Sequence, residues 1–486
     1  MDIAASTPIT ELVPTLQRLR DAWVKQRPDY EQRRNDLQRL RKAFHARLDE
    51  MAAAVSADFG HRSMHESLLA DGMTVLSELD HMIANLRRWM RPQRRGVGWR
   101  LWPASAQVRH VPLGVVGVIA PWNYPVNLSL VPLATAIAAG NHVYLKPSEY
   151  NPRTNAFLRE LLAEVFPADR VAVALGSSDV AAAFASLPFD HIMFTGSTAV
   201  GRKIMAAAAP NLTPVTLELG GKSPAVIGSD APMETTAARI ATGKLFNGGQ
   251  TCIAPDYVFV PEARRDELVQ ALRREVASRY PDLESSSDFT TIINEGNYRR
   301  LRGYLDDARE RGLELIPLAQ LKDAPMAESR RLLPPTLVME PGDDAKVMQE
   351  EIFGPILPIR TYRRFDEVID YINARPAPLV AYWFGPDGET FRTFLRNTRS
   401  GGVARNDFAA QMIPSAAPFG GVGRSGMGAY HGKAGFDAFS HQRTVVGSDL
   451  PFSMTGSAAP PFRRGMQIYA DMTLSMARRR TRRRLS

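Results

Sequence analysis

Apolar residues in the first part of the chain recur at helical spacing. Between positions 37 and 55 they fall at three- and four-residue steps within a highly charged stretch, at Leu37, Leu40, Phe44, Leu48, Met51 and Val55. That spacing places them on one stripe of an exposed helix, with the polar residues on its other faces. We therefore expect the first hundred residues to be mainly helical.

From Val111 the pattern changes to short apolar runs that alternate with helical segments. In chain order they read VVGVIA, LATAIAAG, HVYLK, TNAFLRELLAEVF, VAVAL, DVAAAFASL, HIMFT and AVGRKIMAAAA. Such alternation predicts parallel strands joined by crossover helices. A second α/β unit begins near Glu218, where PVTLELGG, PAVIG and DYVFVP are expected strands and ETTAARIATGKLFNGG an expected helix. The predicted fold class is α/β.

A stretch without Asp, Glu, Lys or Arg runs from His110 to Leu145. Its length alone would permit a membrane span. Its content argues against one, because its prolines and asparagines would break a helix and leave polar groups unsatisfied in lipid. We expect a buried strand, loop and helix instead.

Composition indicates a globular protein of two or three domains. The 486 residues are 44% hydrophobic and 23% charged, inside the range of chains that bury sizeable cores. A single cysteine permits no internal disulfide and no cysteine-rich zinc site, so no metal site is expected and a reducing cytoplasm is the expected compartment. The N-terminus has no basic segment followed by an apolar run, so we expect no cleaved signal there.

The net charge of +9 is concentrated at the C-terminal end, where MARRRTRRRLS carries six arginines. Without them the charge falls to +3, so no specific nucleic-acid partner is expected. The favoured interpretation of this end is a solvated, disordered terminus. The alternative is a short amphipathic helix that docks weakly on an anionic membrane, based on Met466, Tyr469, Met472 and Met476.

Two residues are candidates for covalent and acid–base chemistry. Cys252 lies in NGGQTC, a glycine-bearing loop after a helical segment, where exposed backbone N–H groups would favour a thiolate. A lone cysteine can equally be a small buried apolar residue. Glu218, in LELGGK, ends an apolar strand and would project into a cleft as a general base. The alternative is a surface carboxylate paired with Lys222.

Two segments fit a dinucleotide. FTGSTAVG places Gly196, Ser197 and Gly201 between a strand and the head of a helix, where free N–H groups attract a pyrophosphate. Glycines there can also serve only a tight connection. Lys146 and Glu149, in LKPSE, follow another strand, where an acidic side chain can bind ribose hydroxyls and disfavour a 2′-phosphate.

Over about residues 20–445 the motifs PWNYP, KPSE, FTGSTAVG, LELGGK, GQTC and EEIFGP, in this order, resemble the aldehyde dehydrogenase superfamily. The resemblance implies a Rossmann-like parallel-sheet cofactor domain, an α/β catalytic domain, a small arm and a homodimer. The implied boundaries are 1–217 for the N-terminal helices and cofactor domain, 218–406 for the catalytic domain, 407–445 for the return segment and oligomerisation arm, and 446–486 for the tail.

The resemblance also implies roles for individual residues. Cys252 is the nucleophile that forms a thiohemiacetal and then a thioester, and Glu218 is the base that activates water to hydrolyse the thioester. The Asn123 side chain and the Cys252 N–H form the oxyanion hole. For an NAD cofactor, with NADP also accepted, the implied binding residues are Trp122, Lys146, Glu149, Gly196, Ser197, Gly201, Glu351 and Phe353.

Further segments resemble the branch of the class 3 enzymes and coniferyl aldehyde dehydrogenases, namely GQTCIAPDYV, SGMGAYHGKAGFDAFSHQR and SADFGHRS. This implies a coniferyl or other aromatic aldehyde as substrate, with a medium- or long-chain fatty aldehyde as the alternative. After about Val446 the chain departs from the class 3 pattern, because a polar stretch and arginines replace an apolar tail. An inherited membrane anchor is therefore not assumed.

Three other functions stay open at this stage. A CoA-acylating enzyme would pass the thioester to a thiol and would not need Glu218. An inactive dinucleotide-binding relative is opposed by intact Cys252, Glu218 and Asn123. A cysteine hydrolase of esters would make acid without NAD(P)+, so the cofactor dependence of acid formation from an aldehyde separates it from a dehydrogenase.

Overall fold

The computed structural model describes residues 6–98, 101, 104–449, 460 and 464–485. The chain divides into two compact units, the first formed by Met1–Trp89 and Pro112–Ser440, the second by Met90–Val111 and His441–Ser486. The larger unit contains two sheets with their helices, and the smaller unit contains a third sheet and the last helix.

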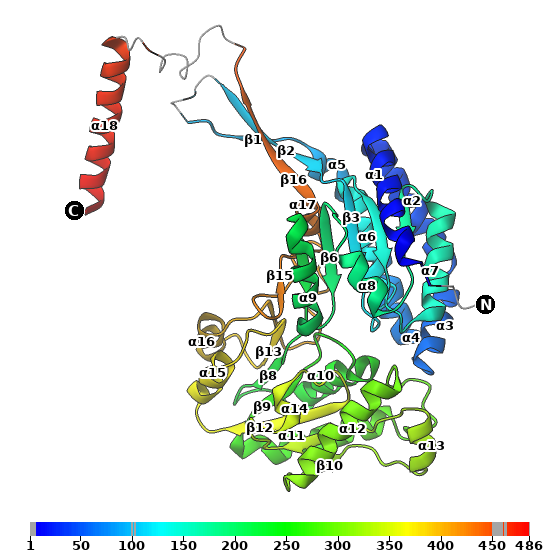
Figure 1. The fold of residues 1–486 in the computed structure, drawn as a ribbon. Coiled ribbons are helices and arrows are strands. Elements are labelled where there is room, and N and C mark those ends of the chain that lie inside the picture. The colour runs from blue at the N-terminus through cyan, green and yellow to red at the C-terminus, as the bar shows by residue number, and fades with distance from the viewer. Residues whose placement is uncertain (1–5, 99–100, 102–103, 450–459, 461–463, 486) are drawn as a thin grey trace. The chain divides into compact units, whose positions relative to one another are not determined.

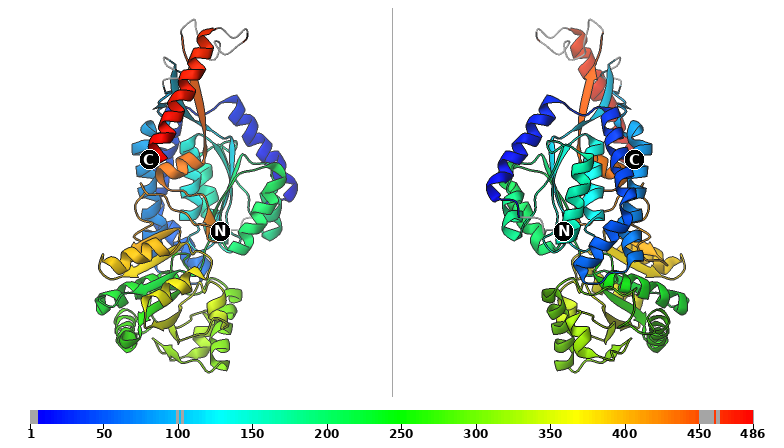
Figure 2. Two further views of the ribbon diagram at one scale, coloured as in Figure 1. Left: turned by 90° about the vertical axis from the view of Figure 1, so that its left-hand side faces the viewer. Right: turned by 90° about the vertical axis from the view of Figure 1, so that its right-hand side faces the viewer.

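The N-terminal segment is helical up to Met90, as its apolar stripe predicts. The stripe from Leu37 to Val55 runs through two helices that meet at Arg47, and it is buried except at Leu48. In both views of Figure 2 the dark blue first helix and the lighter blue helices that follow it lie on opposite sides of the larger unit. The helices are α1 (Leu12–Lys25), α2 (Tyr30–Ala46), α3 (Leu48–Phe59), α4 (Met64–Ser67) and α5 (Thr74–Met90), with the π-helical turn η2 (Leu68–Met73) between the last two.

The first sheet confirms the alternation of strands and helices predicted after Val111. Its order is β15-β7-β6-β3-β4-β5, and every neighbouring pair of strands is parallel except β15 with β7. The order reverses at β3, which has β4 on one side and β6 on the other (Figure 1). Its strands are β3 (Val115–Ile119), β4 (His142–Lys146), β5 (Val171–Val173), β6 (His191–Thr195), β7 (Val215–Glu218) and β15 (Gly426–Met427), and its helices are α6 (Asn127–Ala139), α7 (Pro152–Val165), α8 (Ser178–Ala185) and α9 (Thr198–Ala208).

The charge-free stretch forms the centre of this sheet. It supplies β3, helix α6 and most of β4, and all residues of α6 are buried. The predicted strand, loop and helix are therefore confirmed. Within the described residues, no helix is both long enough and apolar enough to cross a membrane.

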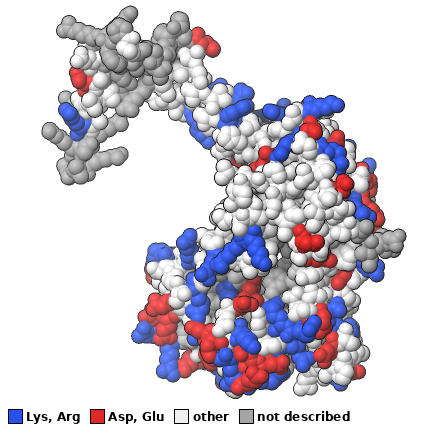
Figure 3. Space-filling model, viewed as in Figure 1, with Lys and Arg blue, Asp and Glu red and all other residues white. Residues whose placement is uncertain are grey.

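The second sheet has the order β10-β11-β12-β9-β8-β13-β14, antiparallel only between β10 and β11. The chain passes from the first sheet to the second between Glu218 and Pro224. On the face in Figure 3, acidic and basic side chains are interleaved over this part of the molecule. Its strands are β8 (Pro224–Ile227), β9 (Tyr257–Pro261), β10 (Leu315–Pro317), β11 (Thr336–Met339), β12 (Ile356–Tyr362), β13 (Val380–Phe384) and β14 (Gly402–Arg405), with α10 (Met233–Leu245), α11 (Arg265–Arg279), α12 (Glu295–Glu310), α13 (Ala324–Ser329), α14 (Lys346–Gln349), α15 (Phe365–Asn373) and α16 (Glu389–Asn397); α17 (Gly432–Ala438) follows later in the chain.

The smaller unit differs from the sequence prediction in two ways. Its sheet pairs β1 (Gln93–Arg95), β2 (Ser105–Pro112) and β16 (Ser440–Gly447). The first hundred residues therefore end in a strand and not in a helix, and β2 joins a strand far along the chain. The terminus expected to be disordered contains helix α18 (Arg464–Leu485). Residues 450–459 of that tail, and the side chains of Met466 and Tyr469, lie outside the described residues.

Candidate active site

A tight turn after helix α10 presents the single cysteine. Asn247, Gly248 and Gly249 have positive φ angles of 54°, 60° and 78°. At Gly249 a Cβ would lie 2.4 Å from the carbonyl oxygen of Gly354, so only glycine fits this close approach. Cys252 follows three residues later, partly exposed, in the loop before β9.

A cleft of about 680 Å³ opens at Cys252. It lies beyond the carboxyl ends of β3 and β6, the point where the strand order of the first sheet reverses, which is where open α/β sheets bind ligands. Eight of the candidate residues line it, namely Trp122, Asn123, Gly196, Ser197, Glu218, Cys252, Glu351 and Phe353.

Three candidate residues lie outside that lining. Gly201 is buried in α9, where a Cβ would meet Leu219 at 2.7 Å, so it allows the helix to pack closely against that side chain. Lys146 is buried at the end of β4, and its Nζ lies 3.8 Å from Glu149 Oε2. The Glu149 side chain is about one-third exposed.

Glu218 ends β7 as a buried carboxyl group. Neither of its carboxyl oxygens has a hydrogen-bond partner, and burial raises the pKa of Glu218 well above its ordinary value. The surface pairing with Lys222 considered above is wrong. The Lys222 ammonium instead contacts Asp256 and donates to the backbone carbonyls of Val347 and Glu350, at 2.9 and 3.0 Å.

The surroundings of Cys252 disfavour its thiolate form. Burial raises the pKa of Cys252 to about 12, and the charges of Glu351 and Glu218 add to the rise. The backbone N–H groups of Cys252 and Ile253 lower the same pKa, as expected for a thiolate-favouring loop, but burial outweighs them. The two N–H groups therefore favour a thiolate as expected, while the net shift of the Cys252 pKa is upward.

Glu351 faces the cleft from the loop before β12. Burial raises the pKa of Glu351 to about 8, with the charge of Asp256 next in effect, while a hydrogen bond from the Gly221 N–H lowers it. A Cβ on Gly220 would lie 2.0 Å from Glu351 Oε2, so the carboxyl group lies directly against that glycine.

Asn123 lines the same cleft as Cys252, from the loop after β3. Its Nδ2 donates to the Gln250 carbonyl at 3.1 Å, which leaves the second amide hydrogen for another acceptor. Trp122 and Phe353 meet edge to face with ring centroids 5.3 Å apart. Asn123 follows a strand of the first sheet and Cys252 precedes a strand of the second, so the two residues reach the cleft from different sheets.

Donor groups in the cleft and at the nearby end of β4 fit a dinucleotide. Ser197 caps α9 by accepting from the Val200 N–H, and Thr198 and Ala199 of the first helical turn line the cleft, where their helix end favours an anion. The ammonium of Lys146 donates to the Pro147 carbonyl at 2.8 Å, and an ammonium has two further hydrogens for ribose hydroxyls.

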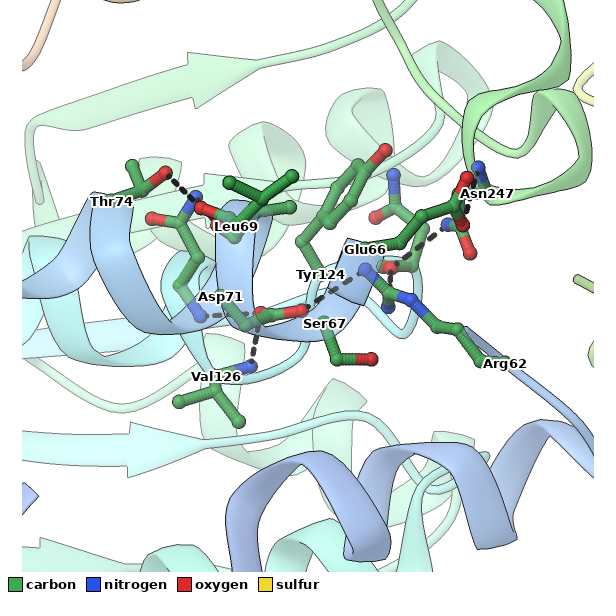
Figure 4. Close-up of polar contacts among 12 residues, drawn as sticks. Arg62, Glu66, Ser67, Leu69, Asp71, Thr74, Tyr124, Val126 and Asn247 are labelled. Atoms are coloured by element: carbon green, nitrogen blue, oxygen red, sulfur yellow. Dashed lines mark hydrogen bonds and ion pairs between the residues drawn. The ribbon is translucent and has the colours of Figure 1, made fainter. Parts of the chain in front are cut away.

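Sequence reasoning missed the buried charged residues behind this cleft. Arg62, Glu66 and Asp71 support the loops that carry Asn123 and Cys252 (Figure 4). Arg62 lies in the SADFGHRS segment, but the pattern gives no sign that its side chain is buried. Among the described residues, no group of three or more His, Cys, Asp or Glu side chains could hold a metal ion.

Loops from two mainly parallel sheets line one cleft, which holds the single cysteine and the first turn of helix α9. A nucleophile beside an anion-favouring helix end is the arrangement expected of a nucleotide-dependent oxidoreductase. The model of the aldehyde dehydrogenase family matches residues 9–445. The chain therefore belongs to the aldehyde dehydrogenase family, whose members use NAD(P)+, and it is an enzyme that oxidises aldehydes.

Individual relatives cover nearly the whole chain. A Pseudomonas aeruginosa protein named "Probable coniferyl aldehyde dehydrogenase" is 48% identical over 94% of this chain and 95% of its own. Aldehyde dehydrogenase family 3 member B1 of Rattus norvegicus is 40% identical over 89% and 90%. The structure of Staphylococcus aureus AldH in a substrate-bound state matches with a TM-score of 0.90 and 34% identity, covering 96% of this chain and all of that one.

Proposed function

We propose that this enzyme oxidises coniferaldehyde or a related phenylpropanoid aldehyde to the carboxylic acid, with NAD as the preferred cofactor and NADP also accepted. The observation that carries the mechanism is the convergence of Cys252, Asn123 and Glu218 on one cleft. The substrate proposal rests on the similarity to the coniferyl aldehyde dehydrogenase relative.

The first covalent step joins Cys252 to the aldehyde. The Sγ–C bond forms, the thiol proton leaves to water in the open cleft, and the carbonyl electron pair moves to oxygen. The second hydrogen of Asn123 Nδ2 and the Cys252 N–H stabilise that oxyanion, because fixed donors need no reorganisation as charge develops. Bound NAD+ supplies the acceptor for the hydride that leaves the aldehyde carbon, so a thioester remains on Cys252.

Hydrolysis of the thioester needs a base, and Glu218 is placed for it. As a water oxygen bonds to the acyl carbon, the water gives a proton to the Glu218 carboxylate, the C–S bond breaks and the acid leaves. A carboxylate with a raised pKa is a stronger base and takes a proton from water more readily than an ordinary carboxylate does, once it is ionised. The burial that raises the pKa of Glu218 therefore suits this role.

The cofactor residues divide by the part of NAD they would bind. Lys146 and Glu149 would hold the adenosine ribose, and Glu351 the nicotinamide ribose, beside Trp122 and Phe353. Gly196 and Ser197 would lie on the phosphate side, with Gly201 behind them as a packing residue. We assign 1–217 to the cofactor domain, 218–406 to the catalytic domain, 407–445 to the return and arm segment, and 446–486 to the tail.

We further propose that the enzyme works as a cytoplasmic homodimer. The single cysteine suits a reducing compartment. The sheet of β1, β2 and β16 is a natural pairing element, because an exposed strand edge presents unpaired backbone groups to another chain. We also propose weak contact of the arginine-rich end with anionic membranes, since helix α18 carries exposed apolar residues before its arginines.

The substrate proposal is tested by kcat/KM for a panel of cinnamyl, benzyl and straight-chain aldehydes, with NADH and NADPH formation measured for each. We expect coniferaldehyde to exceed hexanal and decanal. A value for either aliphatic aldehyde about tenfold above that for coniferaldehyde would instead assign the enzyme to fatty aldehydes.

A further inference from the structure

A buried arginine lies directly behind the loop that carries Asn123. The Arg62 side chain has no exposed surface, and its Nη1 donates to the Asn123 backbone carbonyl at 2.9 Å. Its Nη2 lies 3.2 Å from Asp71 Oδ2, and its guanidinium carbon is 5.2 and 4.9 Å from the ring centres of Phe59 and Tyr124. Aromatic contacts and an ion pair thus hold the arginine in place, and its hydrogen bond to the Asn123 carbonyl holds the loop. Figure 4 shows the ion pair with Asp71 and the nearby Tyr124.

Asp71 fixes the other end of the same loop. It lies in the π-helical turn η2, and its Oδ1 accepts from the backbone N–H groups of Val126 and Asn127 at 3.1 and 2.8 Å. These donors lie at the start of helix α6, where N–H groups have no partner within the helix. The loop from Asn123 to Val126 is therefore held at both ends by one buried ion pair.

A second connection joins this loop to the cysteine turn. Glu66 Oε2 accepts from the Asn247 N–H at 3.0 Å and from the Thr290 hydroxyl at 2.9 Å. Asn247 Nδ2 in turn donates at 3.1 Å to the same Asn123 carbonyl that accepts from Arg62. That carbonyl is the point at which the N-terminal helices, the Asn123 loop and the Cys252 turn meet.

We propose that Arg62 is a positioning residue for the chemical step, which holds the Asn123 amide where the oxyanion forms beside Cys252. The inference rests on the proposed oxyanion role of Asn123. The Asn123 carbonyl accepts from both Arg62 and Asn247, so a change at Arg62 acts directly on the position of Asn123. A small displacement of that amide weakens an interaction that exists only in the transition state.

The test compares single-turnover hydride transfer with alkylation of Cys252 by iodoacetamide, a displacement that builds no oxyanion. Arg62→Lys keeps a positive charge beside Asp71 but replaces the planar guanidinium by a compact ammonium. Arg62→Met fills the space with a side chain that has no hydrogen-bond donor. Each is combined with Asn123→Ala. Arg170→Lys is the matched control, because Arg170 makes a buried ion pair with Asp36 at 2.8 Å and does not line the cleft.

Asn123→Ala should slow hydride transfer about a hundredfold and Arg62→Lys at least about tenfold, while iodoacetamide alkylation changes less than about twofold. The double variant should be no slower than Asn123→Ala, because both act through one amide. Arg170→Lys should change neither rate, even where it lowers the melting temperature.

Each contrary result has a distinct meaning. If Asn123→Ala leaves hydride transfer unchanged, the oxyanion role in the proposed function fails and this inference fails with it. If Asn123→Ala slows the step but the Arg62 variants do not, only the inference fails. Three other results would make Arg62 a general structural residue. The rate losses of Asn123→Ala and an Arg62 variant could multiply in the double variant, or alkylation could slow as much as hydride transfer. Both Arg62 variants could also lose cooperative thermal unfolding.

Discussion

Cys252 is the only cysteine in the chain, so the covalent scheme depends on one sulfur atom. Cys252→Ala should abolish both aldehyde oxidation and any esterase activity, to below about a thousandth of wild type. NADH formation and ester hydrolysis, measured with a thermal melt to show that the variant folds, check this. Substantial turnover by a folded Cys252→Ala enzyme is incompatible with a thioester on this residue.

The environment of Glu218 predicts both a kinetic and a pH effect. Because its pKa is raised, the carboxyl group is protonated at low pH and becomes a base only as pH rises. Steady turnover limited by hydrolysis should therefore increase with pH. Glu218→Gln should lose that rise and give a burst of NADH followed by little turnover, as stopped-flow absorbance would show.

Glu78 provides the control for this experiment. It is also a buried carboxyl group whose pKa is raised by burial, but it lies on α5 and does not line the cleft. Glu78→Gln should keep the wild-type ratio of burst to steady rate and its pH dependence. A normal steady-state rate for Glu218→Gln would remove Glu218 from the role of base.

At the scale of elements, Lys146 ends strand β4 and Glu149 follows it in the next loop, where both are expected to bind the adenosine ribose. Glu149→Gln removes the charge that disfavours a 2′-phosphate but keeps the side-chain shape, so it should narrow the preference for NAD over NADP. The ratio of kcat/KM for the two cofactors measures the effect. Glu164→Gln, an exposed carboxylate on α7 near Arg47, is the matched control. A ratio equal to wild type for Glu149→Gln would show that this carboxylate does not read the ribose.

Elements with local signals were predicted well from the sequence. The strands at Val115–Ile119, His142–Lys146 and His191–Thr195 are short apolar runs bounded by turns, and each confirms its prediction. The pairing of β2 with β16 could not be predicted, because its partners lie more than 300 residues apart in the sequence. At one end of the pair the Ser105 hydroxyl donates to the Gly447 carbonyl at 3.5 Å. Local periodicity carries no information on such contacts.

The candidate site was predictable in its parts but not in its electrostatics. Motif order was enough to select Asn123, Glu218, Cys252 and Glu351, and the structure places all of them at one cleft. The raised pKa of Cys252 could not be foreseen, because it depends on burial and on carboxyl groups from distant segments. Arg62 was missed for the same reason, since an arginine beside His61 has no sequence feature that marks it as buried.

At the scale of the whole molecule, positive charge is concentrated at the C-terminal end of the sequence. Six arginines lie in the last eleven residues, while the rest of the chain carries only +3. Helix α18 places Ile468, Met472 and Met476 at four-residue steps, each at least about 40% exposed. An apolar stripe with a basic end is the pattern of a helix that lies on an anionic membrane surface.

This arrangement predicts salt-sensitive binding to anionic vesicles. Each arginine near the surface contributes on the order of 1 kcal/mol at low salt, and salt screens that attraction. The full chain should sediment with anionic vesicles at low salt but not at high salt, and not with zwitterionic vesicles. A chain ending at Arg464 should stay in the supernatant throughout and keep wild-type turnover, because the cleft is built entirely from residues before Ser440. Equal sedimentation of the two chains at low salt would show that the tail does not mediate membrane contact.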